Sequence, residues 1–492
     1  MSHPTNPTAQ GRDFGSARYR WYVLITLTAI YTLNFIDRAL LSVLAQPVIS
    51  TFGLTDTEFG FLAGPPFALF YALMGIPIAL AADRYNRVTI ISVCIAIWSL
   101  MTALCGFATG FLFLLIARVG VAIGEAGSTP PSNSLIGDYY RASARAKALA
   151  IFSTGVMLGN TLAYLVGGPL GQMSDESVKA VLGIFGLAQL PEWLGWGNDY
   201  GWRFAFIALG VPGVIFAFIV WLTVREPPRG YADASTTASE KTSISATFGL
   251  LLTKRSYWYM TAGASLVAMV GYGLVSFQAP MMQRLHGMAP GEFALRFGVP
   301  LSVAGAFGTL LAGYVIDRLN KRTIRAVAIW PAITMALAAP LYILAFNQPG
   351  DRLELALALW LLAALLHYGY LGAQYTIGQG VVPASSRASA IAIMLFIIAL
   401  VGNGLGPQIV GLMSDSFMAA ALEARGVADS LSVSACNPKA IAMLAPNDQA
   451  ICSAVYAEGL QNSMSLTALF MLPAAWFFYL SSRTLDREML AR

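Results

Sequence analysis

Charged residues are scarce in this chain. Only 11% of its 492 residues are Asp, Glu, Lys or Arg, whereas 57% are hydrophobic. Soluble domains carry about a quarter charged residues, so this composition excludes a soluble globular protein. It predicts an all-α polytopic membrane protein.

Cysteine and histidine are scarce as well. The chain has four cysteines and three histidines, and their spacing matches no metal site. Neither a nucleophile-base set nor a phosphate-binding loop is present in the sequence. We therefore expect no enzyme, no cofactor and no metal.

Twelve apolar stretches are each long enough for a transmembrane helix, since about 20 apolar residues cross the hydrocarbon core of a bilayer. They cover residues 21–47, 58–82, 88–107, 110–137, 145–171, 202–224, 257–283, 293–316, 324–346, 354–381, 388–413 and 463–481. The first 18 residues are polar, and the run that follows is too long for the core of a signal peptide, so no cleavable signal is expected.

Lysine and arginine are concentrated on one side of this topology. If the amino terminus is cytoplasmic, the inner segments hold 21 of the 30 Lys and Arg residues, the outer segments hold seven, and Arg38 and Arg118 lie within spans. Positive residues are retained in the cytoplasm, so both termini are predicted to be cytoplasmic. The net charge of +5 is this orientation signal, and no nucleic acid partner is expected.

The two halves of the chain repeat the same motifs, which predicts two related six-helix bundles. A turn with Asp83, Arg84 and Arg87 after the second span returns in the second half with Asp317 and Arg318. Further matches follow in order: 141–151 with 383–393, Gly159-Asn160 with Gly402-Asn403, and 168–175 with 406–415. The offset between matched positions stays between 234 and 243 residues.

The predicted domains follow from these repeats. They are an amino-terminal cytoplasmic tail (1–20), a first bundle (21–224), a cytoplasmic linker (225–256), a second bundle (257–482) with an outer loop (416–462), and a carboxy-terminal cytoplasmic tail (483–492). Cys436 and Cys452 share the outer loop, which would face an oxidising compartment. The sequence does not decide whether these two cysteines form a disulfide or remain two free thiols.

Four charged residues lie at membrane depth, where each costs about 2.5 to 3.5 kcal/mol and usually serves a pathway. Asp37 and Arg38 are neighbours in the first span, and side chains of adjacent helical residues point about 100° apart. Arg118 and Glu125 are seven residues apart in the fourth span, which places them on one helix face. Opposite charges offset desolvation, so we expect all four to form one cross-helix cluster.

The types of these residues suggest roles in transport. A carboxylate gains or loses a proton as its surroundings change, so Asp37 and then Glu125 are the candidates for proton coupling. Arginine binds phosphate or carboxylate, which suits Arg38 to a solute headgroup or to control of Asp37. The polar residues that complete the candidate network are Asn34, Arg118, Asn160, Tyr370 and Gln374. The alternative is a purely structural ion pair, or a structural clasp of Glu125 with Arg118.

Together these features resemble the major facilitator superfamily, whose members are transporters with twelve spans in two six-span halves. The stretch from Asn34 to Arg38, the region from Phe67 to Pro77, and the segment from Arg118 to Glu125 look like a bacterial member of its Spinster branch. Anion:cation symporters share the Asn-aromatic-x-Asp-Arg motif of the first span. The second-half turn differs from the first, with Lys321 where Arg87 stands.

The resemblance implies alternating access by rocking of the two halves, coupled to protons, for a solute of the lysophospholipid or sphingosine-1-phosphate class. It places the coupling role on Asp37 and supporting roles on Arg38, Arg118 and Glu125. The turn residues would close the cytoplasmic side in the outward-open state: Asp83, Arg84, Arg87, Asp317 and Arg318.

We therefore expect a monomeric secondary active transporter in the bacterial inner membrane, which moves a small amphipathic or anionic, lipid-like solute and contacts membrane lipid. The alternatives are an organic-anion symporter and a proton-independent facilitator or exporter of amphiphiles. An intramembrane enzyme and a sensor without transport are less favoured.

Overall fold

The computed structural model describes residues 13–197, 199–232, 244–321 and 323–490, and the regular elements of these residues are helices. Twelve stretches of this described part are long and apolar enough to cross a membrane, and each overlaps one of the twelve predicted spans. The predicted amino-terminal tail and linker lie partly outside the described residues.

The first half folds into one bundle. Its elements are α1 (Ala17–Val43), α2 (Ala45–Phe52), α3 (Asp56–Ala63), α4 (Pro65–Arg84), α5 (Arg87–Cys105), α6 (Phe111–Ala126), α7 (Thr129–Tyr139), α8 (Ala142–Leu162), a π-helical turn (Ala163–Gly167), α9 (Gly168–Gly171), α10 (Asp175–Ile184), α11 (Leu190–Trp193) and α12 (Tyr200–Thr223). Within this bundle α1 packs on α8, and α5 packs on α6 and α12.

The second half repeats the arrangement after the linker helix α13 (Ile244–Leu252). Its elements are α14 (Arg255–His286), α15 (Pro290–Phe293), a π-helical turn (Ala294–Gly298), α16 (Val299–Asn320), α17 (Ala326–Phe346), α18 (Leu353–His367), α19 (Leu371–Gly380), α20 (Arg387–Ala399), a π-helical turn (Leu400–Leu405), α21 (Gly406–Ala424), α22 (Pro438–Ile441), α23 (Pro446–Leu469) and α24 (Met471–Glu488). Short 3₁₀ turns cover Gly350–Arg352, Tyr368–Tyr370 and Ala384–Ser386.

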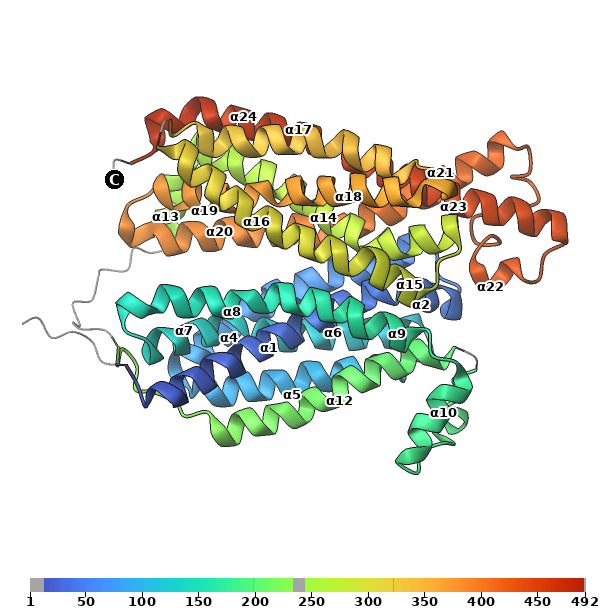
Figure 1. The fold of residues 1–492 in the computed structure, drawn as a ribbon, viewed down its shortest axis with the longest axis horizontal. Helices are drawn as coiled ribbons and strands as arrows, with labels where there is room; N and C mark the ends of the chain where they lie inside the picture. Colours follow the sequence, from blue (N-terminus) through green and yellow to red (C-terminus); the bar gives the residue numbers. More distant parts are fainter. Residues whose placement is uncertain (1–12, 198, 233–243, 322, 491–492) are drawn as a thin grey trace, which may run out of the picture.

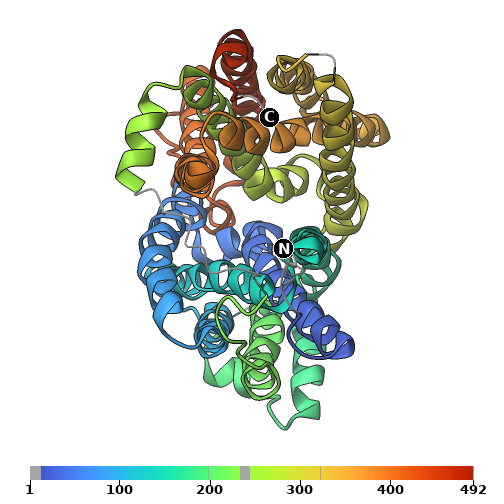
Figure 2. The ribbon, with the colours of Figure 1, turned by 90° about the vertical axis from the view of Figure 1, so that its left-hand side faces the viewer.

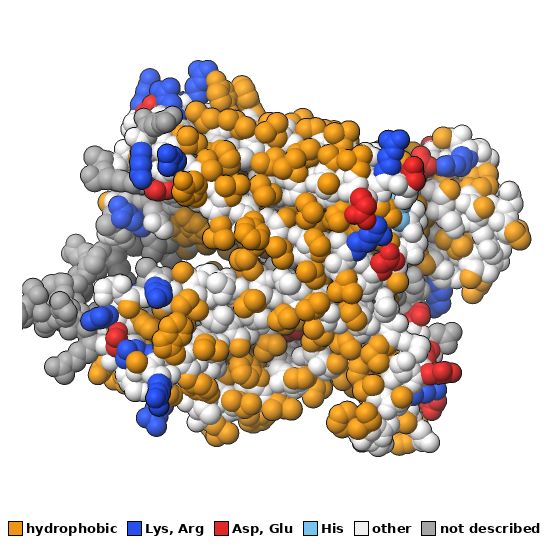
Figure 3. All heavy atoms as spheres, viewed as in Figure 1, with side chains coloured by type: hydrophobic (Ala, Val, Ile, Leu, Met, Phe, Trp, Pro, Cys, Tyr) orange, Lys and Arg blue, Asp and Glu red, His pale blue; other side chains and the backbone are white. Residues whose placement is uncertain are grey.

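The two halves lie as two layers, the first below and the second above in Figure 1. The chain enters and leaves the molecule at the same end, which faces the viewer in Figure 2. We call this the inner end and the opposite one the outer end. Hydrophobic side chains cover the sides of the bundle between these ends, and charged side chains gather at the ends (Figure 3).

Proline sets the irregular turns within the spans. Each π-helical turn ends two residues before a proline, namely Pro169, Pro300 and Pro407. A proline ring clashes with the carbonyl group four residues earlier, and a wider turn moves that carbonyl away. Two of these turns occupy matched positions before the repeated Gly-Pro pairs of spans five and eleven, so the sequence repeat is also a backbone repeat.

Close packing of α8 on α1 fixes the depth and rotation of the first span. A Cβ atom added at Gly155 would lie 2.9 Å from the carbonyl oxygen of Thr28, so only glycine permits this approach. With α1 held in this way, Asp37 is buried inside the first bundle.

The outer loop predicted at 416–462 is partly helical, because the two flanking helices extend into it. The eleventh span continues as α21 to Ala424, and the last one already begins with α23 at Pro446. Hydropathy marks only the lipid-embedded part of a helix, whereas these extensions are stabilised by a small core of their own. That core contains Met418, Leu422, Leu431, Cys436, Cys452, Val455 and Tyr456.

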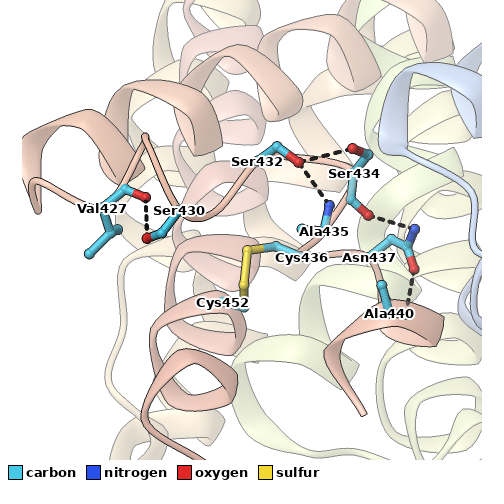
Figure 4. The surroundings of a disulfide bond; sticks show 9 residues. All are labelled: Val427, Ser430, Ser432, Ser434, Ala435, Cys436, Asn437, Ala440 and Cys452. Carbon is cyan, nitrogen blue, oxygen red and sulfur yellow. Dashed lines mark hydrogen bonds between the residues drawn. A yellow bond between two sulfur atoms is a disulfide. The ribbon is translucent and has the colours of Figure 1, made fainter. Parts of the chain in front are cut away.

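The structure joins Cys436 and Cys452 in a disulfide, which was one of the two possibilities left open by the sequence. Figure 4 shows the bond between the loop before α22 and the first turns of α23, with Asn437 capping α22 through its side chain. Beside it, Asn437 and Lys439 approach Gly53 of the first half. The disulfide therefore secures a loop that bridges the two halves at the outer end.

Replacing both cysteines by serine should destabilise this outer segment. The disulfide closes a loop with a sequence separation of 16, and such a loop contributes about 3 kcal/mol by restricting the unfolded chain. We expect the Cys436→Ser/Cys452→Ser protein to be cut faster by protease between α21 and α23 and to melt at a lower temperature. Reductant should reproduce the effect in the wild type and add nothing to the variant; equal protease resistance of both proteins would contradict this role.

Candidate functional site

An ion pair between α1 and α6 is the centre of the candidate site. Arg38 donates from Nε to the Glu125 carboxylate at 2.6 Å. The Arg38 side chain is 19% exposed, whereas the Glu125 side chain is fully buried. Glu125 is the second-last residue of α6, directly before a break in span four where Gly127 and Ser128 precede α7. The site thus has a partly accessible cation with its counterion behind it.

Asp37 lies in the same bundle but faces a different neighbour. Among the described residues, no ion pair of the Asp37 carboxylate with an arginine is found; Arg118 instead donates to the Asp37 backbone carbonyl at 3.4 Å. The groups around the carboxylate include Thr102 of α5 and Glu125. The four charges thus lie close together, since Asp37 and Glu125 each also interact electrostatically with Arg118, but the only carboxylate–arginine ion pair found among them in the described part of the chain is Arg38–Glu125.

Aromatic rings surround the two arginines. The Arg38 guanidinium carbon lies 4.6 Å from the ring centre of Tyr71, 5.2 Å from that of Phe35 and 5.5 Å from that of Phe67. The Arg118 guanidinium lies 5.1 Å from the same Phe67 ring. An aromatic face attracts a cation, so Phe67 between the two guanidinium groups offsets their mutual repulsion.

Tyrosines of both halves converge near Arg38. Tyr31 of α1 is close enough to interact electrostatically with Arg38, with Tyr71 of α4, and with Tyr272 and Tyr375 of the second half. The last two come from α14 and α19 and are 40% and 42% exposed. The wall opposite Arg38 is therefore aromatic and carries hydroxyl groups.

Several buried polar atoms near this site lack a partner within the described part of the chain. Asn34 is only 1% exposed, and neither atom of its side-chain amide makes a hydrogen bond. One carboxylate oxygen of Glu125 and Nε of Arg118 also lack a hydrogen-bond partner. In the second half the same holds for the side-chain oxygen of Gln374. Unsatisfied buried groups are costly in a folded protein, so their presence here is typical of a functional site.

Two other predicted network residues lie differently. Asn160 is half-buried on α8. Tyr370 is buried in the second half, where its ring stacks on Phe478 with 6.5 Å between centroids. Tyr272 and Tyr375 thus occupy the exposed aromatic wall, while Tyr370 packs behind it.

The residues predicted to close the inner end do not join the two halves here. Asp83, Arg84, Asp317 and Arg318 are all exposed, and Asp317 pairs with Lys321 of its own helix at 3.7 Å. The prediction that they brace this end concerns the opposite, outward-open state, and it stays a prediction.

Arg87 has a different environment from these four residues. It is 1% exposed and pairs with Asp138 at 2.5 Å and with Glu226 at 2.6 Å. It also donates to the carbonyl of Pro227, so it ties α5, α7 and the start of the linker together. In this structure Arg87 contacts its own half and the linker, not the second half.

Substitution Arg87→Ala should lower stability rather than alter gating. It leaves two carboxylates partly buried without their cation, and breaking such a pair costs about 3 kcal/mol. We expect a lower melting temperature in detergent, with Arg84→Ala as an exposed control that melts like the wild type. If Arg87→Ala melted normally and changed only transport, its assignment to the gate would be restored.

A second charged cluster joins the halves at the outer end. Arg284 of α14 donates two hydrogen bonds of 2.7 Å to the two Asp56 carboxylate oxygens at the start of α3. Both side chains are at least 96% buried, with exposures of 4% and 1%. Ser414 of α21 donates to Asp56 at 2.6 Å, and the Tyr456 ring centre lies 3.6 Å from the guanidinium.

Asp415 completes this cluster. Its carboxylate accepts the backbone N–H groups of Asp56 at 3.2 Å and of Thr57 at 2.9 Å. An anion at a helix amino terminus is stabilised by the unpaired N–H groups and the helix dipole. We call Asp56, Arg284, Ser414, Asp415 and Tyr456 the outer latch.

Further contacts between the halves lie at the same end. Gln278 of α14 donates to the Tyr164 hydroxyl of the first half, and Gln172 accepts the backbone N–H of Gly291 at 2.8 Å. The structure is therefore closed at its outer end.

Sequence reasoning missed the outer latch. By the predicted span bounds, Asp56 and Arg284 lie in outer segments, and Asp415 is the last residue of the repeat 406–415. The available signal is weak, because each is a charge beside the outer end of a span, where charges are common.

Comparison with known proteins identifies the family. The model described as Major Facilitator Superfamily matches residues 27–407. An MFS-type efflux pump of Mycolicibacterium smegmatis is 33% identical over 405 residues, which cover 82% of this chain and 86% of the relative. The chain therefore belongs to the major facilitator superfamily, and it is a transporter rather than an enzyme.

Its relatives also define the branch. A bacterial homolog to the human lysosomal transporter Spinster, solved in an inward-facing and unoccupied conformation, is 45% identical with a TM-score of 0.89, covering 97% of this chain and all of the other. The occupied inward-facing form gives a TM-score of 0.88. Protein spinster of Drosophila melanogaster is 24% identical over 84% of this chain and 65% of its own length. The chain is thus a secondary transporter of Spinster type.

Proposed function

We propose that this transporter couples proton movement to the passage of an amphipathic solute with an anionic headgroup. The observation that supports this most is the Arg38–Glu125 pair, in which an accessible cation is neutralised by a fully buried carboxylate. A proton on Glu125 would remove the counterion and leave Arg38 to bind an anion. Binding of the anion and loss of the proton would then oppose each other through one arginine.

The surroundings of Arg38 fit such a headgroup. Only Nε is engaged with Glu125, so the terminal nitrogens remain for a phosphate or carboxylate, which arginine binds through paired hydrogen bonds. The tyrosine hydroxyls of both halves add neutral donors, and their rings suit an apolar tail. The resemblance to the Spinster branch makes the lysophospholipid or sphingosine-1-phosphate class the solute to test.

Asp37 is proposed as the second proton site. Its carboxylate is buried without an arginine ion pair, near Thr102 and Glu125. Protonation of a buried carboxylate removes a charge that the bundle must otherwise accommodate, so the proton state of Asp37 would bias how α1 packs on α5. In the outward-open state Asp83, Arg84, Asp317 and Arg318 would then bring the inner ends together.

A second candidate function is export without proton coupling. The Mycolicibacterium smegmatis relative is named as an efflux pump, which favours outward movement of amphiphiles. The count of Lys and Arg supports a cytoplasmic location of both termini. We also propose that the protein is a monomer in a bacterial inner membrane.

A ligand-stabilisation screen would test the headgroup site. A ligand that binds only the folded state stabilises it, by about 2.7 kcal/mol at a ligand concentration of 100 times Kd. The melting temperature rises as a result. We expect lysophospholipids or sphingoid phosphates to stabilise the wild type in detergent more strongly at lower pH, where Glu125 releases Arg38. The Arg38→Gln protein should lose this shift, whereas Arg84→Gln should keep it. Equal shifts in both variants would place the headgroup elsewhere.

A further inference from the structure

The segment between spans five and six forms a folded projection at the outer end. It contains α10 and α11, and we call residues 175–196 the outer hairpin. Val178, Leu182 and Trp196 form a small core with Tyr200 of α12. Lys179 pairs with Glu192 at 2.7 Å across the hairpin, and Asp175 accepts the backbone N–H of Tyr200 at 2.8 Å. The hairpin is thus internally supported rather than an unstructured loop.

The tip of the outer hairpin is apolar and uncovered. Ile184 is 78% exposed, Phe185 is 73%, Leu187 is 45% and Trp193 is 78%. Gly186 adopts a φ of 73°, which turns the chain sharply and places Ile184, Phe185 and Leu187 at the far end of α10, whereas Trp193 lies at the end of α11 next to Glu192. The charged pair of the hairpin, Lys179 with Glu192, lies on its body. The hairpin is therefore apolar at its tip and polar nearer its base.

The outer hairpin lies beside the outer ends of spans five and six. The hairpin begins directly after α9, where span five ends, and returns directly to α12, where span six begins. Figure 1 shows α10 extending sideways from the first half near the outer ends of the spans, away from the second half. Hydrophobic side chains are gathered on this projection in Figure 3. The tip therefore lies beside the protein at the level where the outer membrane surface begins.

We propose that the tip of the outer hairpin docks into the headgroup and acyl boundary of the outer leaflet beside the transporter. Tryptophan and phenylalanine favour this boundary, and short apolar segments insert there by roughly 5 to 10 Å. A second copy of the chain fits less well, because four side chains are far fewer than the roughly 20 to 30 residues per side of a stable interface. Contact with lipid also explains why so much apolar surface is uncovered outside the spans.

Fluorescence quenching by depth-labelled lipids tests this proposal. A bimane label on Ile184→Cys, in full-length protein reconstituted into vesicles, should be quenched several-fold more by lipids with a doxyl group near the headgroup than the same label on Met443→Cys. Met443 is the matched control, because it is 83% exposed at the outer end on the disulfide-closed loop. Cys94 and Cys105 are buried and should stay unlabelled.

Phe185→Cys gives a second position should the first variant fail to fold. Quenching at both tip positions equal to that at Met443 would overturn the proposal. So would a signal that depends on protein density in the vesicle, because that result would indicate docking between copies of the chain.

Discussion

The Asp37→Asn protein should reconstitute normally and lose uptake driven by a pH gradient. Asparagine keeps the size of the buried side chain but cannot bind or release the proton, so the gradient has nothing to act on at this position. With a labelled lysophospholipid in proteoliposomes, we expect driven uptake to fall to the level of protein-free vesicles. Exchange of solute at equal pH on both sides should persist, because it needs no net proton movement.

Glu423→Gln is the matched control for this experiment. Glu423 is an exposed carboxylate on α21, and its replacement removes the same charge without touching the bundle interior. It should transport like the wild type. Unchanged driven uptake in Asp37→Asn would remove Asp37 from the coupling mechanism, and loss of exchange as well would indicate a structural role.

The Arg284→Gln protein should open at its outer end. This change leaves Asp56 buried without its cation, and breaking a buried pair costs about 3 to 5 kcal/mol in the state that contains it. A penalty of that size shifts a two-state equilibrium by roughly two to four orders of magnitude. Spin labels on exposed Glu176 and Asp351, one in each half, should therefore report a longer distance than in the wild type.

Two further variants separate the latch from a general loss of charge. Asp56→Asn combined with Arg284→Gln removes both charges and leaves no unpaired one, so its opening should be smaller than that of Arg284→Gln alone. Arg296→Gln breaks an exposed pair with Glu354 inside the second half, and exposed pairs contribute little, so it should not change the distance. If Arg284→Gln gave the wild-type distance, the outer latch would not be what holds this end closed.

The candidate site shows which relations a linear pattern reveals. Asp37, Arg38, Arg118 and Glu125 stand out because a charge in an apolar run is costly, and the structure brings all four into one bundle. Their pairing was not predictable in the same way. Whether Arg38 or Arg118 reaches Glu125 depends on how α1 is rotated against α6, and that rotation is set by its contact with Gly155 on α8.

The outer latch was hidden for a related reason. Asp56, Arg284 and Asp415 are charges at span ends, where charges are common and cost little if exposed. Their role becomes visible only in the structure, where the two halves meet at the outer end and bury Asp56 and Arg284 away from water. The aromatic wall differs, because the tyrosines of spans seven and ten already suggest a wall of this kind from the sequence. The structure decides that Tyr272 and Tyr375 are exposed there, whereas Tyr370 is buried.

The sequence by itself determined the twelve spans, the two repeated halves and the charged residues of the first bundle, because each is a local matter of hydrophobicity or of a motif along one chain segment. Only the tertiary structure decided that Glu125 pairs with Arg38, that Arg87 belongs to its own half, and that Asp56 and Arg284 close the outer end. Those outcomes depend on which helix faces meet across distant parts of the chain, and the free energy of a charge is set by the partner and the burial that such a meeting provides.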